Sequence, residues 1–399
     1  MRSPEKISSR PRLEVADIFQ AYGDHFRKTH RLTSKQHSVM RDIEQCRTGE
    51  LGYHVDICSS CGHEEHAYNS CRDRHCPKCQ GVARRQWIQS RLSDLLPVLY
   101  YHVVFTLPHK LHPVGKYNRE KIYDLLFAAA SETLLQFGRD PKHLGAEVGF
   151  FGILHTWGGK LWDHFHLHFV VPGGGLTVDD QWVEPKYKGK FLFPVQAMSL
   201  VFRGKFIEGL KSLYAAGELE IPEEMKHLKK SEQFEKWLNV LVARNWVVYA
   251  KKPFSTPEKV VRYVGRYTHK VAISNNRIIA MDDGKVRFNF RNYRNKGKWE
   301  ETSLAIDEFI RRFLFHVLPK GFHRIRHYGF MANGRCKANL EKIRTLLQAK
   351  TPEEKPQETE RIKCQKCMKG EMLPMKVITP FKTIILRPWW LLGVDACPG

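Results

Sequence analysis

Three histidines alternate within one apolar segment of the chain: His164, His166 and His168. Alternate side chains of a β-strand share one face, so the three imidazoles are expected on a single face of a strand. His155 ends the preceding apolar segment, and the sequence GGKL between the two segments is typical of a hairpin. We therefore predict that His155, His166 and His168 bind a catalytic divalent ion and that His164 supports them. The alternative is a set of scattered core or surface histidines.

Two tyrosines follow later in the chain at a helical spacing. Tyr263 and Tyr267 are four residues apart, which places both phenols on one face of a helix. Arg262 and Arg266 repeat this interval, and Lys270 follows them. A phenol has a pKa near 10, so its attack on a phosphate needs activation by a metal or by nearby cations. Structural tyrosine pairs often share this spacing, but the neighbouring cations and the predicted metal site favour nucleophiles.

Ten cysteines are present, and several of them form CxxC pairs. Without a segment that resembles an export signal, this pattern indicates metal binding in a reducing compartment and not disulfides. A CxxC turn brings two thiolates to one tetrahedral ion at about 2.3 Å. We predict one structural zinc ion held by Cys58, Cys61, Cys76 and Cys79.

Further potential ligands surround these four cysteines and leave room for another ligand set or a second ion. Cys71 and His75 are candidate substitutes, and the remaining spare ligands are His63 and His66. The C-terminal pair Cys364 and Cys367 is half of a site, which Cys336 or Cys397 could complete only at poor spacing. The basic residues flanking the cluster are expected to contact phosphates: Arg72, Arg74, Lys78, Arg84 and Arg85.

The charge of the chain indicates a polyanionic partner. Lysine and arginine number 65 against 42 acidic residues, which gives a formal net charge of +23. Nucleic acid is the commonest such partner, and a merely basic soluble protein is the alternative. Hydrophobic residues make up 42% of the chain, and no uninterrupted apolar stretch reaches the roughly 18 residues of a membrane helix. We expect a cytoplasmic, nucleoid-associated protein with no membrane partner and no small-molecule substrate.

The elements that must position these residues form an α+β pattern. Two helices are predicted near the N-terminus, and strands alternate with helices over residues 98–330. The hairpin carrying the histidines implies that part of the sheet is antiparallel. A capping box formed by Ser255 and Glu258, or Thr256 followed by Pro257, predicts the start of the tyrosine helix.

Taken together, the motifs resemble a known family over residues 13–348. They comprise the CxxCG and RHCPKCQ segments, HVVFTLPH, LHTWG, a His-hydrophobe-His strand, VPGGGL, YVGRYTHKVAISN and GFHRIRHYGF. This combination resembles the rolling-circle transposases of insertion-sequence family ninety-one, which belong to the HUH endonuclease superfamily with two tyrosines.

The resemblance implies an N-terminal zinc-binding domain followed by an HUH nuclease domain, whose antiparallel sheet is flanked by helices around a ferredoxin- or RRM-like core. The expected divisions are a helical and zinc-binding domain, the nuclease domain, a helix with a linker, and a tail with a single CxxC. Their boundaries are residues 1–92, 98–330, 331–361 and 362–399.

The resemblance also implies an activity. Members of the family nick one DNA strand at the element's end, join a tyrosine to the 5′ phosphate and leave a free 3′-OH. The catalytic ion expected on the histidines is Mg²⁺ or Mn²⁺, and three histidine ligands suit Mn²⁺ at least as well. Carried onto this chain, His166 and His168 match the HUH pair, and Tyr263 and Tyr267 match the nucleophiles. His155 matches the third ligand of related relaxases by its spacing. Phe165 stands where the family usually has a proline, and the ligands remain intact.

Three other functions are compatible with parts of this pattern. A plasmid replication initiator or relaxase would share the chemistry and differ in biological outcome. A non-catalytic zinc-containing DNA-binding regulator would use the cysteines but not the tyrosines. A zinc hydrolase acting on a small acidic substrate would need no tyrosine and would form no covalent DNA adduct.

Overall fold

A computed structural model describes residues 13–186, 191–251, 256–268, 271–292, 295–349, 362–379 and 382–386. The chain divides into two compact units. The N-terminal unit combines Met1–Val82, Val271–Val317 and Glu354–Gly399, and the central unit combines Ala83–Lys270 and Leu318–Glu353. Among the described residues, every helix is too short or too polar to cross a membrane.

The central unit is built on a five-stranded sheet in which every neighbouring pair is antiparallel. Its strand order is β12 (Ile325–Tyr328), β4 (Phe150–Trp157), β5 (Asp163–Pro172), β3 (Tyr100–Thr106) and β8 (Val248–Lys251). Strands β4 and β5 form the predicted hairpin, with His155 opposite His166. The predicted α+β class with an antiparallel sheet is therefore confirmed.

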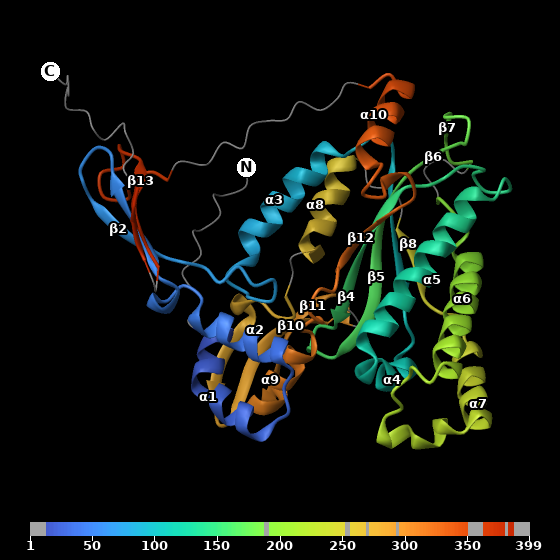
Figure 1. The fold of residues 1–399 in the computed structure, drawn as a ribbon, viewed down its shortest axis with the longest axis horizontal. Coiled ribbons are helices and arrows are strands. Elements are labelled where there is room, and N and C mark those ends of the chain that lie inside the picture. The colour runs from blue at the N-terminus through green and yellow to red at the C-terminus, as the bar shows by residue number, and fades with distance from the viewer. Residues whose placement is uncertain are drawn as a thin grey trace. The chain divides into compact units, whose positions relative to one another are not determined.

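One face of this sheet is covered by α5 (Arg119–Arg139) and α6 (Val195–Ala215) (Figure 1). Aromatic rings fill the interface between the sheet and these helices. Phe105 of β3, for example, packs edge-on against Phe202 of α6 with ring centroids 5.0 Å apart. Tyr123 of α5 packs similarly against Phe165 of β5 at 5.3 Å. Phe165 and the apolar residues that alternate with the histidines thus anchor β5 to the helices, which leaves the histidines on the other face.

The histidine face is covered by α8 (Pro257–Thr268) and by α3 (Gln80–Ser93), whose first turn begins in the N-terminal unit (Figure 1). Val260 and Val264 of α8 join one buried cluster with Ile153 of β4 and Val170 of β5. Helix α8 begins at Pro257, as predicted. The other described α-helices and strands of the unit are α4 (His112–Tyr117), α7 (Ser231–Val242), α10 (Cys336–Leu346), β6 (Gly175–Leu176) and β7 (Trp182–Val183).

The N-terminal unit contains α1 (Val15–Thr29), α2 (Ser34–Gln45) and α9 (Ile306–Phe315). Thr33 caps α2 and Gln36 completes its capping box, which fixes the start of the helix at Ser34. Phe19 of α1 packs edge-on against Phe313 of α9 at 5.4 Å. A three-stranded antiparallel sheet belongs to the same unit, with order β11 (Lys298–Ala305), β10 (Lys285–Asn292) and β9 (Ile278–Asp282).

A second sheet of the N-terminal unit joins strands from opposite ends of the sequence. Its order is β14 (Thr383–Ile385), β13 (Met372–Ile378), β1 (Tyr53–Cys58) and β2 (Glu64–Tyr68), all antiparallel. In Figure 1 the blue hairpin and the red C-terminal strand lie side by side. This organisation differs from the expected domain boundaries, because residues 271–317 and the described tail residues cluster with the N-terminal unit.

Candidate active site and metal centres

Three buried histidines of the central unit form a cluster with the geometry of a metal site. The ligand nitrogens of His155, His166 and His168 all lie within 4.8 Å of one another. Nδ1 of His155 is 2.9 Å from Nε2 of His166. Two nitrogens at right angles around an ion with bonds of about 2.1 Å would be separated by about 3 Å, so this spacing fits a shared ion. We call these residues the histidine cluster.

The surroundings keep His166 and His168 neutral and fix the orientation of His166. Burial lowers the pKa of His166 to about 3, with a smaller contribution from His164. Burial also lowers the pKa of His168 well below its usual value. His166 donates from Nδ1 to the backbone carbonyl of His164 at 2.8 Å, which turns Nε2 toward His155. A neutral imidazole with a fixed tautomer is the form that binds a metal.

His102 of β3 connects the histidine cluster to the tyrosine helix. Its Nε2 lies 2.9 Å from Nδ1 of His168, and both side chains are buried. The ring of Tyr263 packs edge-on against the His102 ring with centroids 5.4 Å apart. Gly265, which follows on α8, allows close contact with α3, because a Cβ there would lie 2.6 Å from Cγ1 of Ile88. Packing of α8 on the sheet thus holds Tyr263 beside the histidines.

The other residues expected around the tyrosines are described only in part. Tyr267 lies one turn beyond Tyr263 in α8, but its side chain and that of Arg266 lie outside the described side chains. Lys270 lies outside the described residues. Arg262 is exposed on the same helix. The i, i+4 arrangement of the two tyrosines on a helix is thus present in the backbone.

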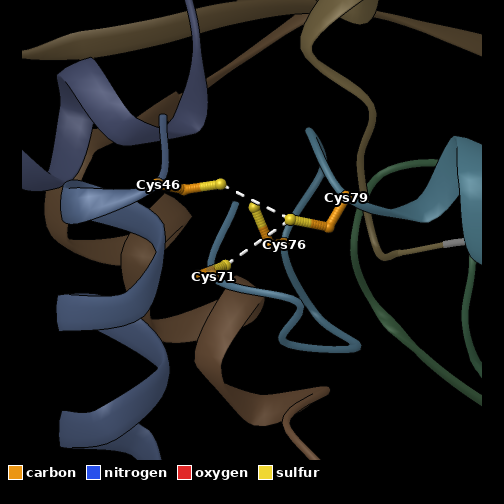
Figure 2. A group of neighbouring side chains, drawn as sticks. All are labelled: Cys46, Cys71, Cys76 and Cys79. Atoms are coloured by element: carbon orange, nitrogen blue, oxygen red, sulfur yellow. Dashed lines mark hydrogen bonds between the residues drawn. The ribbon is translucent and has the colours of Figure 1, made fainter. Parts of the chain in front are cut away.

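The first cysteine cluster consists of Cys46, Cys71, Cys76 and Cys79, whose sulfur atoms lie within 4.8 Å of one another. Figure 2 shows the four side chains converging. Cys79 Sγ is 3.4 Å from Cys46 Sγ and 3.6 Å from Cys71 Sγ. Sulfur atoms bound to one tetrahedral zinc at about 2.3 Å are separated by about 3.8 Å, whereas a disulfide would require about 2.05 Å. The arrangement therefore fits a structural zinc site.

Asp73 orders the loop that carries three of these cysteines. Its carboxylate accepts hydrogen bonds from Lys35 Nζ at 2.7 Å and from the backbone N–H of His75 at 2.7 Å. Burial by itself would raise the pKa of Asp73, but the hydrogen bonds from His75 and Lys35 hold it well below its usual range. His75 pairs with this carboxylate through Nδ1 at 2.9 Å and is not one of the clustered ligands.

The predicted zinc ligands are divided between two places. Cys58 and Cys61 lie with Cys364 and Cys367 in a second cysteine cluster, away from Cys76 and Cys79. The prediction that the four predicted ligands form one zinc site is therefore wrong. Strand β1 pairs with β13, so that Cys58 and Cys61 lie beside the C-terminal cysteine pair.

Two functional residues were missed by the sequence analysis. Cys46 ends α2 and has no CxxC partner to mark it, and His102 is a single histidine in an apolar strand. The other spare ligands belong to no cluster among the described residues: His63, His66 and Cys336. Cys397 lies outside the described part of the chain.

Most of the expected DNA-contacting side chains outside α8 are exposed: Arg72, Arg84 and Arg85. Arg74 is half-buried.

Comparisons with known proteins identify two matching families and several relatives of this chain. A family described as "Transposase zinc-binding domain" matches residues 18–107, and one described as "Putative transposase" matches residues 149–339. The chain is 46% identical over 382 residues to "Putative transposase y4qJ" of Sinorhizobium fredii, covering 91% of this chain and 95% of the relative. It is 30% identical over 328 residues to the transposase for insertion sequence element IS801 of Pseudomonas savastanoi pv. phaseolicola, covering 78% and 76%.

A solved structure with partial similarity is the conjugative relaxase TrwC in its metal-bound complex with oriT DNA. It is 14% identical, covers 43% of this chain and 71% of its own, and has a TM-score of 0.25. The sequence matches define the class, a transposase with an N-terminal zinc-binding domain. Within this class the chain belongs to insertion-sequence family ninety-one, as its motifs indicated.

Proposed function

We propose that this transposase nicks and rejoins single-stranded DNA through a 5′-phosphotyrosine intermediate. The observation that carries the proposal is the position of Tyr263. Its ring contacts His102, and His102 hydrogen-bonds His168 of the histidine cluster. The Tyr263 side chain and the candidate metal site therefore lie on the same side of one sheet, and we propose that both act on a single phosphate.

The proposed step exchanges one phosphate ester for another. The phenol oxygen of Tyr263 or Tyr267 forms a bond to phosphorus, and the bond from phosphorus to O3′ breaks. The tyrosine loses its proton and the departing O3′ gains one, so a free 3′-OH remains. Because the new phosphotyrosine bond replaces the broken ester, the strand can be rejoined without an external energy source. Two tyrosines would allow a second strand to be cut while the first is still attached.

The histidine cluster would hold the catalytic ion, for which Mn²⁺ is at least as suitable as Mg²⁺, since magnesium prefers oxygen ligands. A bound divalent ion would supply Lewis-acid stabilisation of the charge that develops on the phosphate. The side chains of the protein would bind this ion and position the nucleophile. His166 and His168 present neutral nitrogens, and α8 holds Tyr263 against His102.

The basic side chains would hold the DNA backbone. We propose that Arg72, Arg74, Arg84, Arg85, Arg262, Arg266 and Lys270 contact phosphates. Removing Arg84 and Arg85 together should weaken single-strand binding and reduce the slope of log affinity against log salt by about 1.4, from about 0.7 for each phosphate contact. An unchanged slope would show that Arg84 and Arg85 do not contact DNA phosphates.

The test is the formation of a covalent adduct. End-labelled single strands carrying the element's end sequence are incubated with the full chain and Mn²⁺, then boiled in detergent. We expect a labelled protein–DNA adduct that is lost when Tyr263→Phe and Tyr267→Phe are combined. Tyr22→Phe is the matched control, because Tyr22 is 37% exposed on α1 and belongs to the N-terminal unit, not to the unit that carries the histidine cluster. An adduct that survives in the double variant would refute the assignment of nucleophiles.

A second variant separates chemistry from DNA binding. His166→Ala combined with His168→Ala should abolish nicking and leave DNA affinity nearly unchanged, because affinity rests mainly on the basic side chains. A non-catalytic regulator would instead form no adduct in any variant and would bind DNA equally well in all of them.

A further inference from the structure

We propose that Cys58, Cys61, Cys364 and Cys367 bind a second structural zinc ion, which fastens the C-terminal tail to the β1–β2 hairpin. Cys58 Sγ lies 3.6 Å from Cys367 Sγ, and Cys61 Sγ lies 3.8 Å from Cys364 Sγ. These values match the separation of about 3.8 Å between thiolates on one tetrahedral zinc. They are far too long for disulfides, whose sulfur atoms are about 2.05 Å apart. The site is independent of the proposed nicking chemistry.

The two halves of this site repeat one backbone turn. In the first, Gly62 donates its N–H to the Cys58 carbonyl at 3.1 Å, and in the second Met368 donates to the Cys364 carbonyl at 2.9 Å. Both donors have positive φ, 68° for Gly62 and 57° for Met368. Met368 adopts this left-handed conformation although a side chain disfavours it. The same turn, formed twice by segments far apart in sequence, presents four thiols to one point.

Backbone groups at both turns favour the thiolate form that binds zinc. Cys61 donates its N–H to Cys58 Sγ at 3.4 Å, and Gly370 donates to Cys367 Sγ at 3.4 Å. These bonds stabilise negative charge on sulfur. The two turns also bond to each other, because Ser59 donates its N–H to the Glu371 carbonyl at 2.9 Å.

The buried cluster of this sheet consists mainly of the ligands themselves. Its buried members are Cys58, Cys364 and Met372, with Cys367 packed against them. Such a small apolar cluster stabilises little, and a small module of this kind commonly depends on a metal for folding. Four thiolates in tetrahedral geometry suit zinc. Cys364 and Cys367 also lie outside the residues matched by either family, so those matches do not account for this site.

Zinc content distinguishes one structural ion from two. The full chain is prepared with His155→Ala, His166→Ala and His168→Ala, so that zinc in the histidine cluster is not counted, and metal is measured by mass spectrometry. We expect two zinc ions per chain, and one after Cys364→Ser and Cys367→Ser are added. Cys336→Ser is the matched control, because Cys336 lies on α10 outside both cysteine clusters, and it should retain two. One ion in the parent, or two in the double serine variant, would overturn the proposal.

A second measurement covers the case in which the serine variant does not fold. A specific protease site is inserted between residues 353 and 358 of the otherwise unaltered chain, and the protein is cleaved after purification. The C-terminal fragment should co-elute with the rest of the chain when zinc is bound. It should elute separately after a strong chelator has removed the zinc. A fragment that stays bound after zinc removal would show that strand pairing alone holds the tail, which overturns the fastening role.

Discussion

Replacing His102 tests whether the histidine cluster depends on a hydrogen-bonding partner on the neighbouring strand. His102 is 3% exposed and His168 is 6% exposed, and their nitrogens are 2.9 Å apart. His102→Phe keeps an aromatic ring beside Tyr263 but removes the hydrogen bond to Nδ1 of His168. Loss of such a partner behind a metal ligand typically weakens metal affinity 10–100-fold, which corresponds to about 1.4–2.7 kcal/mol. The cost of breaking one buried hydrogen bond, about 1–3 kcal/mol, covers the same range.

The assay is calorimetric titration of Mn²⁺ into the full chain, after both cysteine clusters have been filled with zinc and a mild chelator has removed zinc from the histidine cluster, which would otherwise compete with Mn²⁺. We expect His102→Phe to weaken Mn²⁺ binding 10–100-fold, whereas His102→Gln should restore most of the affinity, because its amide can still hydrogen-bond His168. His316→Phe is the control for replacing a buried histidine in the other unit, at 4% exposure. Wild-type affinity in His102→Phe would refute this reasoning.

Three further outcomes are expected. Gly370→Ala places a methyl group against a ligand sulfur, so zinc in the second cysteine cluster should bind about 1–3 kcal/mol more weakly in a chelator competition. Gly334→Ala adds its Cβ in open space and should change nothing. Gly265→Ala should slow nicking because α8 must move away from Ile88, and adding Ile88→Ala should restore the rate; failure of this rescue would contradict the packing argument. Because the pKa of His166 is about 3, the imidazole is already neutral at pH 7, so Mn²⁺ uptake should release no proton from it. Equal binding enthalpies in phosphate and Tris buffers would agree with this, and a difference corresponding to one proton would not.

The sequence predicts the features that depend on local periodicity. The alternation of His164, His166 and His168 places them on one strand face, and the GGKL segment predicts that His155 lies opposite. Pro257 marks the start of the tyrosine helix for an equally local reason, its fixed φ in the first turn.

Contacts between distant segments could not be read in the same way. His102 meets His168 only because β3 lies beside β5 in the sheet, on the side opposite β4. The partners of Cys58 and Cys61 depend on the pairing of β1 with β13, and spacing along the chain carries no signal of that pairing. Spacing along the chain favours Cys76 and Cys79 as the partners of Cys58 and Cys61. In the fold, Cys76 and Cys79 instead lie with Cys46 and Cys71.

The second cysteine cluster can be completed only late in the synthesis of the protein. Cys61 and Cys364 are separated by 303 positions. At about 5–20 residues per second, translation of that interval takes about 15–60 s. Throughout this time the hairpin leaves the ribosome with two unpaired thiols and an open strand edge, although the other four-cysteine cluster is already complete in sequence. A message cut short before the codon for Cys364 therefore yields a chain in which Cys58 and Cys61 lack the two other members of their cluster.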